Sequence, residues 1–559
     1  MSGSKPLYVG LDCSTQSMTG VVIAALDAAS SKPFEVVASV TFQLDARLPH
    51  YGTIKGVLVD GAHVLVPSLM LVESLDEILA DLSRAVVCAG YSMADIVAVS
   101  GSAQQHTSAF WSATALDLPS DPALPLAAHL AQAFAWPHGR SWMDATTTAE
   151  CRALEAAVGG AQRLADTTGS RGYERFTGVQ LLSLKAALAP VVRMSLASSL
   201  LTSLFLGAYA PIDASDGSGM NLMDLATRAW APDVLAALEA LGLPAATLLR
   251  LLGPAPIASH AVLGRVAPYF VARHGLSPQC RVVPFSGDNP CTLAGMGLAA
   301  AGDVGISLGT SGCLFVVAAP EAIRPSAEEG HVLTNPVDPA TLMGMLCFKN
   351  GSLARENVRD RRANGSWSDF SALMAARPPG NDGVMGFFYL QPEITPVVPT
   401  EAPTARLSGI HGFDADDRPI DLLQSSAAVE VRAIVEWQCL AMHVHLQQLY
   451  QGPVSRLILA GGAAVNPSLL ETLANVFNAP VFVEDNRVNT AALGGAFRAQ
   501  HGVACDDART YVPFEPHVRL ELRATPKAAA HAVYAAMAAR FPALEARAIA
   551  MQVQRYATP

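Results

Sequence analysis

The sequence has few charged residues and no excess of basic ones. Charged side chains make up 15% of the 559 residues, and the formal net charge is -11. Nucleic-acid-binding proteins need a basic face, so this balance argues against such a role for the chain as a whole. Low-complexity runs are absent as well, and 51% of the residues are hydrophobic. The composition therefore excludes a disordered chain and supplies material for large cores.

Cysteine pairs of the form CxxC are absent, and the nine cysteines are scattered singly between Cys13 and Cys505. An odd number of isolated cysteines predicts free thiols in a reducing compartment. The first residues, MSGSKPLYVGLD, run straight into a strand pattern, so we expect no signal peptide and a cytoplasmic protein. The stretch from Met194 to Ile212 carries no charge, but its four serines and one threonine favour a buried helix over a membrane span.

The chain is too long for one ordinary domain, and about two to four domains are expected. Apolar runs such as LYVGLD, DIVAVSGS, VGISLG and RLILAGG alternate with Ala/Leu-rich helical runs. This alternation is typical of an α/β fold. The segment from Pro526 to Ala557 predicts a closing helix, and the proline-rich stretch from Pro392 to Pro403 predicts a surface loop.

The P-loop motif GxxxxGK[ST] is absent, which excludes P-loop kinases. Two other glycine-rich stretches echo each other instead, GLDCSTQS at 10–17 and GISLGTSG at 305–312. Strand-like runs flank both, so each predicts a β-hairpin with a turn of small residues. Such turns let backbone N–H groups and Thr or Ser hydroxyls face an anion. The pair suggests two duplicated domains that face one phosphate chain, although two ordinary hairpins would give the same pattern.

The two copies differ where the first has Asp12 and the second has Ser307. A carboxylate beside a triphosphate is repelled unless a cation intervenes, which makes Asp12 a candidate Mg²⁺ partner, directly or through water. A solvated turn aspartate is the alternative. A third glycine motif, AGGAAVN at 460–466, joins a buried strand to a helix and can admit a flat ring close to the backbone.

A series of motifs runs through the chain in a fixed order, DCSTQ, SGSAQQH, SDGSGMN, SGDNP, SLGTSG and AGGAAVN. In this order they resemble the FGGY family of carbohydrate kinases, in particular its longer, eukaryote-like kinases of D-xylulose. The resemblance implies two actin-like ATPase (ribonuclease H-like) domains with a cleft between them, which we expect at 1–297 and 298–559. It also implies ATP and Mg²⁺ as cofactors, D-xylulose or a related ketose as substrate, and a monomer or homodimer.

Phosphoryl transfer to a sugar needs a hydroxyl held in line with the γ-phosphoryl group and a carboxylate to take its proton. Asp288 is a lone acid among small and apolar neighbours, and the resemblance implies that it is this base. Its neighbour Asn289 is then a sugar contact. An N-cap aspartate before the expected helix CTLAGMGL is the structural alternative.

The resemblance also implies the rest of the site. Sugar contacts are expected at Gln105, His106, Trp142, Asp144 and Arg171, besides Asp288 and Asn289. The alternatives are core packing for the histidine and the tryptophan and a surface ion pair for the arginine. Asp216 and Asn221 can be structural or functional. ATP contacts are expected at Asp12, Ser14, Thr15, Gln16, Gly309, Thr310, Ser311, Trp367, Gly461, Gly462 and Asn466; loop packing is the alternative for Trp367.

Two positions depart from the family pattern. Thr19 stands where many members have a Lys or Arg that approaches the ATP phosphates, so we expect Mg²⁺, Lys349 or backbone donors to neutralise the phosphate charge here. Thr107 follows His106 where close relatives often have Gly, and its extra bulk predicts a narrower sugar pocket.

Three other functions are compatible with these motifs. A family member that acts on ribulose or another ketose or polyol is the nearest. An actin-like ATPase that serves as a chaperone or filament protein shares the phosphate hairpins, but is not expected to have QQH, the Arg171 loop and GDNP. A catalytically silent sugar sensor is the third.

Overall fold

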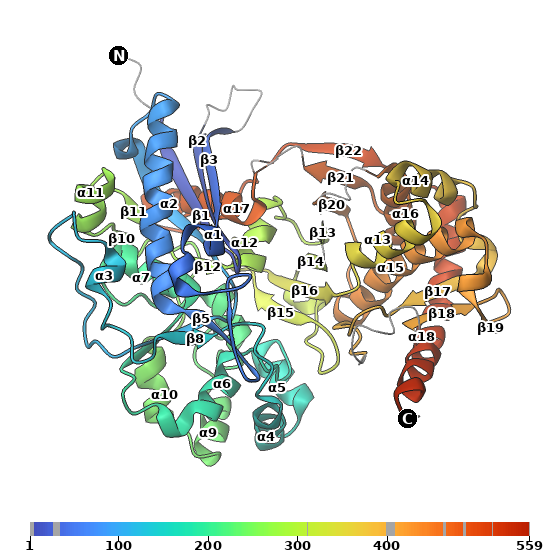
Figure 1. The fold of residues 1–559 in the computed structure, drawn as a ribbon, viewed down its shortest axis with the longest axis horizontal. Helices are drawn as coiled ribbons and strands as arrows, with labels where there is room; N and C mark the ends of the chain where they lie inside the picture. The colour runs from blue at the N-terminus through green and yellow to red at the C-terminus, as the bar shows by residue number, and fades with distance from the viewer. Residues whose placement is uncertain are drawn as a thin grey trace.

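The computed structural model gives the chain as two large β-sheets with helices packed around them (Figure 1). It describes residues 5–25, 34–309, 311–398, 409–461, 466–484, 488–516 and 518–557. Two residues expected at the site, Thr310 and Gly462, lie outside the described residues, as do 399–403 of the proline-rich stretch.

The first sheet is built on the N-terminal hairpin. Its strands are β1 (Leu7–Cys13), β2 (Ser17–Ala25), β3 (Phe34–Gln43), β6 (Ile96–Ala103), β10 (Gly264–Arg265), β11 (Arg281–Val282) and β12 (Ser286–Gly287). The order across the sheet is β10-β11-β6-β1-β2-β3, with β12 also paired to β6. β1 is antiparallel to β2 and parallel to β6. Every residue of β1 is buried, as in a strand covered on both faces.

The second sheet repeats this plan. Its strands are β13 (Asp303–Leu308), β14 (Gly312–Ala318), β15 (His331–Thr334), β16 (Leu342–Phe348), β20 (Arg456–Ala460), β21 (Val481–Glu484) and β22 (Leu520–Ala524). Their order is β15-β16-β14-β13-β20-β21-β22, with β13 antiparallel to β14 and parallel to β20. The hairpin β1–β2 thus corresponds to β13–β14, and β6 corresponds to β20. The two predicted hairpins are confirmed and occupy equivalent places.

Smaller elements surround the sheets. The short strands are β4 (Leu58–Asp60), β5 (His63–Pro67), β7 (Ser108–Trp111), β8 (His138–Arg140), β9 (Arg193–Leu196), β17 (Met385–Phe388), β18 (Ile410–Phe413) and β19 (Pro419–Ile420). The helices are α1 (Leu44–Arg47), α2 (Ser68–Cys88), α3 (Leu126–His129), α4 (Thr148–Val158), α5 (Ala161–Thr168), α6 (Thr177–Leu184), α7 (Ala197–Leu206), α8 (Ala214–Gly217), α9 (Pro232–Ala240), α10 (Ala245–Leu252), α11 (Pro268–His274), α12 (Asp288–Gly295), α13 (Ser352–Arg362), α14 (Trp367–Ala375), α15 (Ala427–Leu449), α16 (Pro467–Phe477), α17 (Thr490–Ala508) and α18 (Ala528–Ala557).

Helices α12 and α17 cross between the two halves of the molecule and pack on opposite sheets. Residues of α17 form a core with β1, β2 and β6, while Leu293 and Ala294 of α12 form a core with the second sheet. Figure 1 shows α17, which is late in the chain and coloured orange-red, among the blue strands of the first sheet. Glycines allow this approach: a Cβ on Gly10 of β1 would lie 1.8 Å from the carbonyl oxygen of Ala492.

Two sequence expectations about single segments hold. The uncharged stretch forms β9 and the buried helix α7, and the C-terminal segment forms α18. Among the described helices, none combines the length and the apolar character that crossing a membrane requires.

Candidate active site

Asp288 is the first residue of α12 and follows β12 directly. The N-cap position belongs to Gly287, and the carboxylate does not act as an N-cap in the way the sequence left open. Its Oδ1 instead accepts hydrogen bonds from the backbone N–H of Asn289, at 2.9 Å, and from the Asn289 side-chain amide, at 3.0 Å. The same amide donates to Gln105 Oε1 at 3.1 Å. These contacts bring together three residues that the sequence predicted for one site.

The surroundings of Asp288 disfavour the ionised form of its carboxyl group. It is half-buried, and burial raises its pKa to about 7, with a further contribution from the charge of Asp12. Asp12 is itself 1% exposed, and burial raises its pKa too. The hydrogen-bond partners of Asp12 among the described residues are neutral: Ser14, Ser102 and the side-chain amide of Asn489. The site therefore holds two neighbouring carboxyl groups, and no positive side chain in the described part of the chain is bonded to either.

His106 follows β6 in a backbone conformation with φ of +67°, which is uncommon outside glycine. Two contacts hold it there: a 2.9 Å hydrogen bond between Nδ1 and the carbonyl oxygen of Gly219, and stacking on Phe176 with ring centroids 4.7 Å apart. A Cβ on Gly219 would lie 2.8 Å from the imidazole, so this position needs glycine. Burial lowers the pKa of His106 to about 3, so the ring is neutral. Because Nδ1 donates to a carbonyl, Nε2 is left as an acceptor.

A cavity of about 230 Å³, here called the central cavity, opens at Asp288. Both halves of the chain contribute to its wall. The lining residues are Gln105, His106, Trp142, Arg175, Phe176, Asp288 and Asn289 from the first half and Ser311, Cys313, His331, Leu333, Met345, Cys347 and Ile394 from the second.

The predicted residues Trp142 and Asp144 have different positions. Trp142 lines the central cavity, remains 41% exposed and donates from Nε1 to Thr15 Oγ1 at 2.9 Å. Asp144 is buried outside the cavity wall and accepts hydrogen bonds from Val64 and Thr146. Asp144 therefore fixes the loop that carries Trp142, and Trp142 in turn contacts the first hairpin.

Arg171 and Arg175 lie in one loop, and both guanidinium groups lie over the ring of Tyr173, at 4.5 and 5.1 Å from its centroid. Arg175 lines the central cavity, whereas the predicted Arg171 is not among its lining residues. Arg175 donates to His331 Nε2 at 3.1 Å, which joins the first half of the chain to β15. Burial and the charge of Arg175 hold the pKa of His331 well below its usual range, so this imidazole is neutral as well.

A second cavity of about 640 Å³, here called the side cavity, lies in the second half of the chain. The predicted residues Gly309, Trp367 and Asn466 line it, together with residues of α13, α14 and α16. Asn466 is the N-cap of α16, and its side-chain oxygen accepts from Ser468 and Leu469 N–H. Trp367 is 43% exposed, with the guanidinium of Arg359 over its ring at 4.6 Å. Gly461, at the end of β20, has φ of +96°.

The turn between β13 and β14 stands between the two cavities. Gly309 lines the side cavity, and Ser311 lines the central cavity. The equivalent turn of the first hairpin has Ser14 and Thr15 half-buried and Gln16 exposed. A chain of phosphates that passed from one cavity to the other would follow these turns.

The positions that depart from the family pattern do not face the cavities. Thr19 is 2% exposed and shares a 3.0 Å hydrogen bond with the hydroxyl of Thr41 on β3. Thr107 is fully buried and donates to Gln104, so its bulk does not narrow the central cavity. Lys349 is exposed, and its backbone N–H donates to the carboxylate of Glu393.

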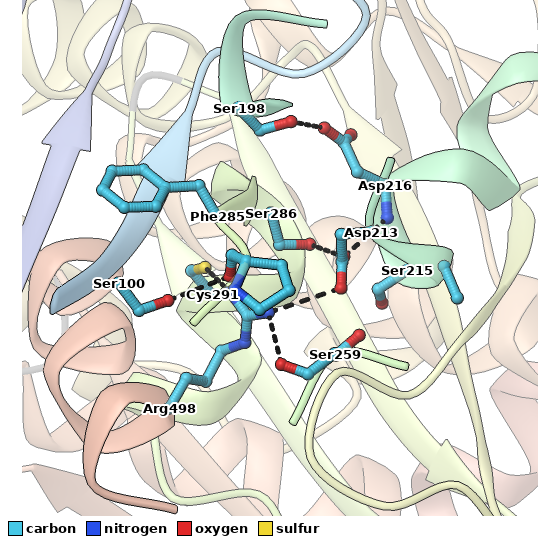
Figure 2. A network of polar contacts seen from close by, with 12 residues as sticks. Ser100, Ser198, Asp213, Ser215, Asp216, Ser259, Phe285, Ser286, Cys291 and Arg498 are labelled. Atoms are coloured by element: carbon cyan, nitrogen blue, oxygen red, sulfur yellow. Dashed lines mark hydrogen bonds and ion pairs between the residues drawn. The ribbon is translucent and has the colours of Figure 1, made fainter. Parts of the chain in front are cut away.

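A buried polar network ties α17 to α12 through a contact between Arg498 and the thiol of Cys291 (Figure 2). Arg498 of α17 is 1% exposed and donates to Asp213 Oδ1 at 3.4 Å and to the Ser259 carbonyl at 3.1 Å. Asp213 Oδ2 also accepts from Ser286 Oγ at 2.6 Å, two residues before Asp288. Asp216, bonded to Ser198, is buried beside it.

Asn221 is also fully buried, and its amide donates to Thr168 and to the Ser170 carbonyl. Asp216 and Asn221 thus support the loops around the central cavity rather than line it.

Sequence reasoning missed several residues of the cavity wall, among them Arg175, His331, Cys313 and Cys347. It also missed Asn489, the N-cap of α17, which donates to Asp12 across the chain at 3.0 Å. Arg175 stands four residues after Arg171 in the same loop, which was an available signal. The others come from β14, β15, β16 and α17, and only the folded chain brings them to the site.

Comparisons with known proteins point to one family. The model of the C-terminal domain of the FGGY family of carbohydrate kinases matches residues 304–503. The chain is 42% identical to the xylulose kinase of Mus musculus over 553 residues, which cover 96% of this chain and 94% of the mouse protein. It is 39% identical to xylulose kinase 2 of Arabidopsis thaliana, over 91% of this chain and 89% of the plant protein.

Solved structures agree on the fold. The xylulose kinase of Rhodospirillum rubrum superposes with a TM-score of 0.75 at 18% identity, over 97% of this chain and 98% of that one. The glycerol kinase of Plasmodium falciparum with ADP gives a TM-score of 0.69 at 12% identity, over 95% and 96%. At such identities the likeness concerns the fold alone, which is the two-domain actin-like ATPase fold that the sequence predicted.

The buried network gives a stability prediction. Replacing Arg498 by Met leaves the Asp213 carboxylate buried without its cation, and we expect a loss of about 3–5 kcal/mol in the free energy of unfolding. Arg163→Met is the matched control, because Arg163 pairs with Asp233 at the surface, with side chains 63% and 69% exposed, and should cost less than about 1 kcal/mol. Urea titration measures both; equal losses in the two variants would contradict the role of the network.

Proposed function

The chain belongs to the FGGY family of carbohydrate kinases, and from that premise we propose that it transfers the γ-phosphoryl group of ATP to the 5-hydroxyl of D-xylulose, giving D-xylulose 5-phosphate. One observation carries the proposal: Asp288 lines the same central cavity as Ser311, and Ser311 belongs to the turn whose Gly309 lines the side cavity. The names of the relatives at 42% and 39% identity support D-xylulose as the sugar.

In this proposal the ketose occupies the central cavity. The unprotonated Nε2 of His106 accepts a hydrogen bond from a sugar hydroxyl, while Gln105 and Asn289 offer both donors and acceptors. Trp142, which donates to Thr15 in the turn of the first hairpin, covers one side of the sugar, and Asp144 fixes the loop that carries Trp142. Arg171 is a further sugar contact in this proposal, because its guanidinium group lies over the same Tyr173 ring as that of Arg175, which lines the cavity.

Asp288 acts as the general base. Its carboxylate takes the proton of the 5-hydroxyl as the oxygen attacks the γ-phosphorus and the bond between that phosphorus and the β,γ-bridging oxygen breaks, releasing ADP. The raised pKa of about 7 suits this task, because a base is most effective when its pKa lies near the working pH. Asn289, which donates to the same carboxylate, holds it in one orientation.

ATP occupies the side cavity with its phosphates along the two hairpin turns. Trp367, Gly461 and Asn466 surround the nucleoside, and Ser14, Thr15, Gln16, Gly309 and Ser311 face the phosphates. The ATP contacts expected at Gly462 and Thr310, which lie outside the described residues, stay predictions. Two helices, α12 and α17, begin next to this region, and the positive ends of their dipoles favour anions.

The residues present fit a magnesium ion. Asp12 and Asp288 offer hard oxygen ligands, and burial raises the pKa of both, with no cation among the described residues bonded to either. Asp12 is the residue that would hold Mg²⁺, directly or through water. When bound, the ion would neutralise charge on the phosphate oxygens. Thr19 cannot take this role, because its side chain is uncharged and buried.

We propose a division of the chain near residue 297, between α12 and β13, with the sugar held mainly by 1–297 and the nucleotide mainly by 298–559. Helix α17 is an exception, because it follows the boundary yet packs on the first sheet. Since residues of both parts line the central cavity, closure of the two parts would exclude water and limit ATP hydrolysis. A cytoplasmic location, as a monomer or homodimer, completes the proposal.

A substrate panel tests the proposed reaction. With ADP release as the readout, we expect the highest kcat/KM for D-xylulose among pentuloses, hexuloses and polyols, and little ADP without sugar. A preference for ribulose would assign another activity of the family. Sugar-independent hydrolysis or ATP-dependent polymerisation would favour a non-metabolic ATPase, and sugar binding without turnover would favour a sensor.

Asp288→Asn tests the base. The variant keeps the shape of the side chain but cannot accept the proton, so kcat should fall by about 10²–10⁴-fold while the Kd for D-xylulose changes little. Asp60→Asn, at an exposed position of β4, is the control and should retain wild-type kcat. A kcat of Asp288→Asn within tenfold of wild type would refute the assignment.

The raised pKa predicts a pH dependence. The base is active when ionised, so kcat/KM for the sugar should fall as the pH drops through about 7, by about tenfold per pH unit below it, and level off above. Asp12→Asn removes a neighbouring negative charge and should move the inflection to lower pH. An inflection near pH 4 in the wild type would contradict the burial argument.

A further inference from the structure

Two cysteines face each other across neighbouring strands in the wall of the central cavity. Cys313 of β14 and Cys347 of β16 are directly opposed in the antiparallel register, and their Sγ atoms are 3.6 Å apart. Directly opposed residues of antiparallel strands have Cα atoms about 4.5–5.5 Å apart, which lies within the range that a disulfide bridges. The backbone therefore already has the spacing for a covalent link.

The pair differs from the other cysteines of the chain. Both side chains are partly exposed to the cavity, whereas six of the remaining cysteines are buried and Cys88 is exposed on the surface. A small molecule that reaches Asp288 therefore also reaches these two sulfur atoms.

The surroundings make the two sulfurs unequal. A hydrogen bond from Cys313 and the charge of Arg175 lower the pKa of Cys347, while the same pairing and burial raise the pKa of Cys313. The thiolate is the reactive form, so Cys347 is the attacking sulfur and Cys313 the resolving one.

We propose that Cys313 and Cys347 form a reactive dithiol, a covalent modification site that low-molecular-weight disulfides oxidise to a cross-strand disulfide. The Cys347 thiolate attacks one sulfur of the disulfide RSSR, forms a mixed disulfide and expels RS⁻, which takes up a proton. Cys313 then loses its proton, attacks the sulfur of Cys347 and releases the second RSH. The dithiol loses two electrons and two protons, and RSSR becomes two RSH.

The bond would disturb the site. It draws the sulfurs from 3.6 Å to about 2.05 Å at the start of β14 and the end of β16. β14 begins directly after the turn that separates the two cavities. The loop after β16 leads to Ser352, whose N–H donates to the carbonyl of Gly309 in that turn. Because small misplacements of reacting groups are costly, we expect oxidation to lower kinase activity by about tenfold or more. This consequence rests on the proposed function, but the modification itself does not.

The test uses the full-length protein and oxidised glutathione. After alkylation of free thiols, peptide mass spectrometry should find a Cys313–Cys347 peptide lighter by two hydrogens, which dithiothreitol restores. Activity should fall and recover in parallel, and D-xylulose bound in the central cavity should slow the oxidation.

Variants separate the dithiol from other thiols. The ratio of oxidised to reduced activity should be near one for Cys347→Ser, while Cys88→Ser, the control, should respond like wild type. Cys313→Ser lacks the resolving sulfur, so its mass spectrum should show glutathione retained on Cys347 and no link. Failure to find the Cys313–Cys347 link, or loss of activity in Cys347→Ser equal to that of wild type, would overturn the proposal. A link without loss of activity would overturn the inhibition. Should the protein phosphorylate another sugar, the mass-spectrometric result would still decide on the dithiol.

Discussion

Helices α12 and α17 approach each other so closely that a Cβ on Gly295 or on Gly494 would lie 1.9 Å from a backbone oxygen of the other helix. This contact has consequences at both helix starts. α12 begins with Asp288, and Asn489, which caps α17, donates to Asp12. Each helix packs on the sheet of the other half of the chain. The crossing thus fixes the two carboxylates, Asp288 and Asp12, relative to each other and to both sheets. Arg498 of α17 stabilises this arrangement through its buried ion pair with Asp213.

The electrostatics of the site follow from this arrangement. Two carboxyl groups are held together in partly or fully buried positions, and both have raised pKa values because burial disfavours their charged forms. Two imidazoles nearby, His106 and His331, are neutral for the same reason. A site of this kind gains from a bound divalent cation, and its neutral imidazoles and amides offer hydrogen bonds to a sugar. It is suited to phosphoryl transfer between a metal–nucleotide complex and an uncharged hydroxyl.

Much of this could be predicted from the sequence, because the relevant signals are local. The echo of GLDCSTQS in GISLGTSG gave two equivalent hairpins, and the lone acid of SGDNP lies in the central cavity. The contacts that sequence reasoning missed join distant segments. Nothing in the pattern of α17 indicates that it returns to the first sheet, since an apolar helix face does not specify its partner. Arg175 with His331, and Cys313 with Cys347, likewise meet only through sheet register and packing across the two halves.

The central claim is that Asp288 faces the acceptor hydroxyl beside the terminal phosphate of the nucleotide. A crystal structure with D-xylulose and a non-hydrolysable ATP analogue with Mg²⁺ tests it most directly. The account predicts an Asp288 carboxylate oxygen about 2.6–3.2 Å from the 5-hydroxyl oxygen, with that oxygen in line with the γ-phosphorus. A sugar bound with its 5-hydroxyl directed away from Asp288, or a nucleotide whose phosphates leave the turn between β13 and β14, would contradict it.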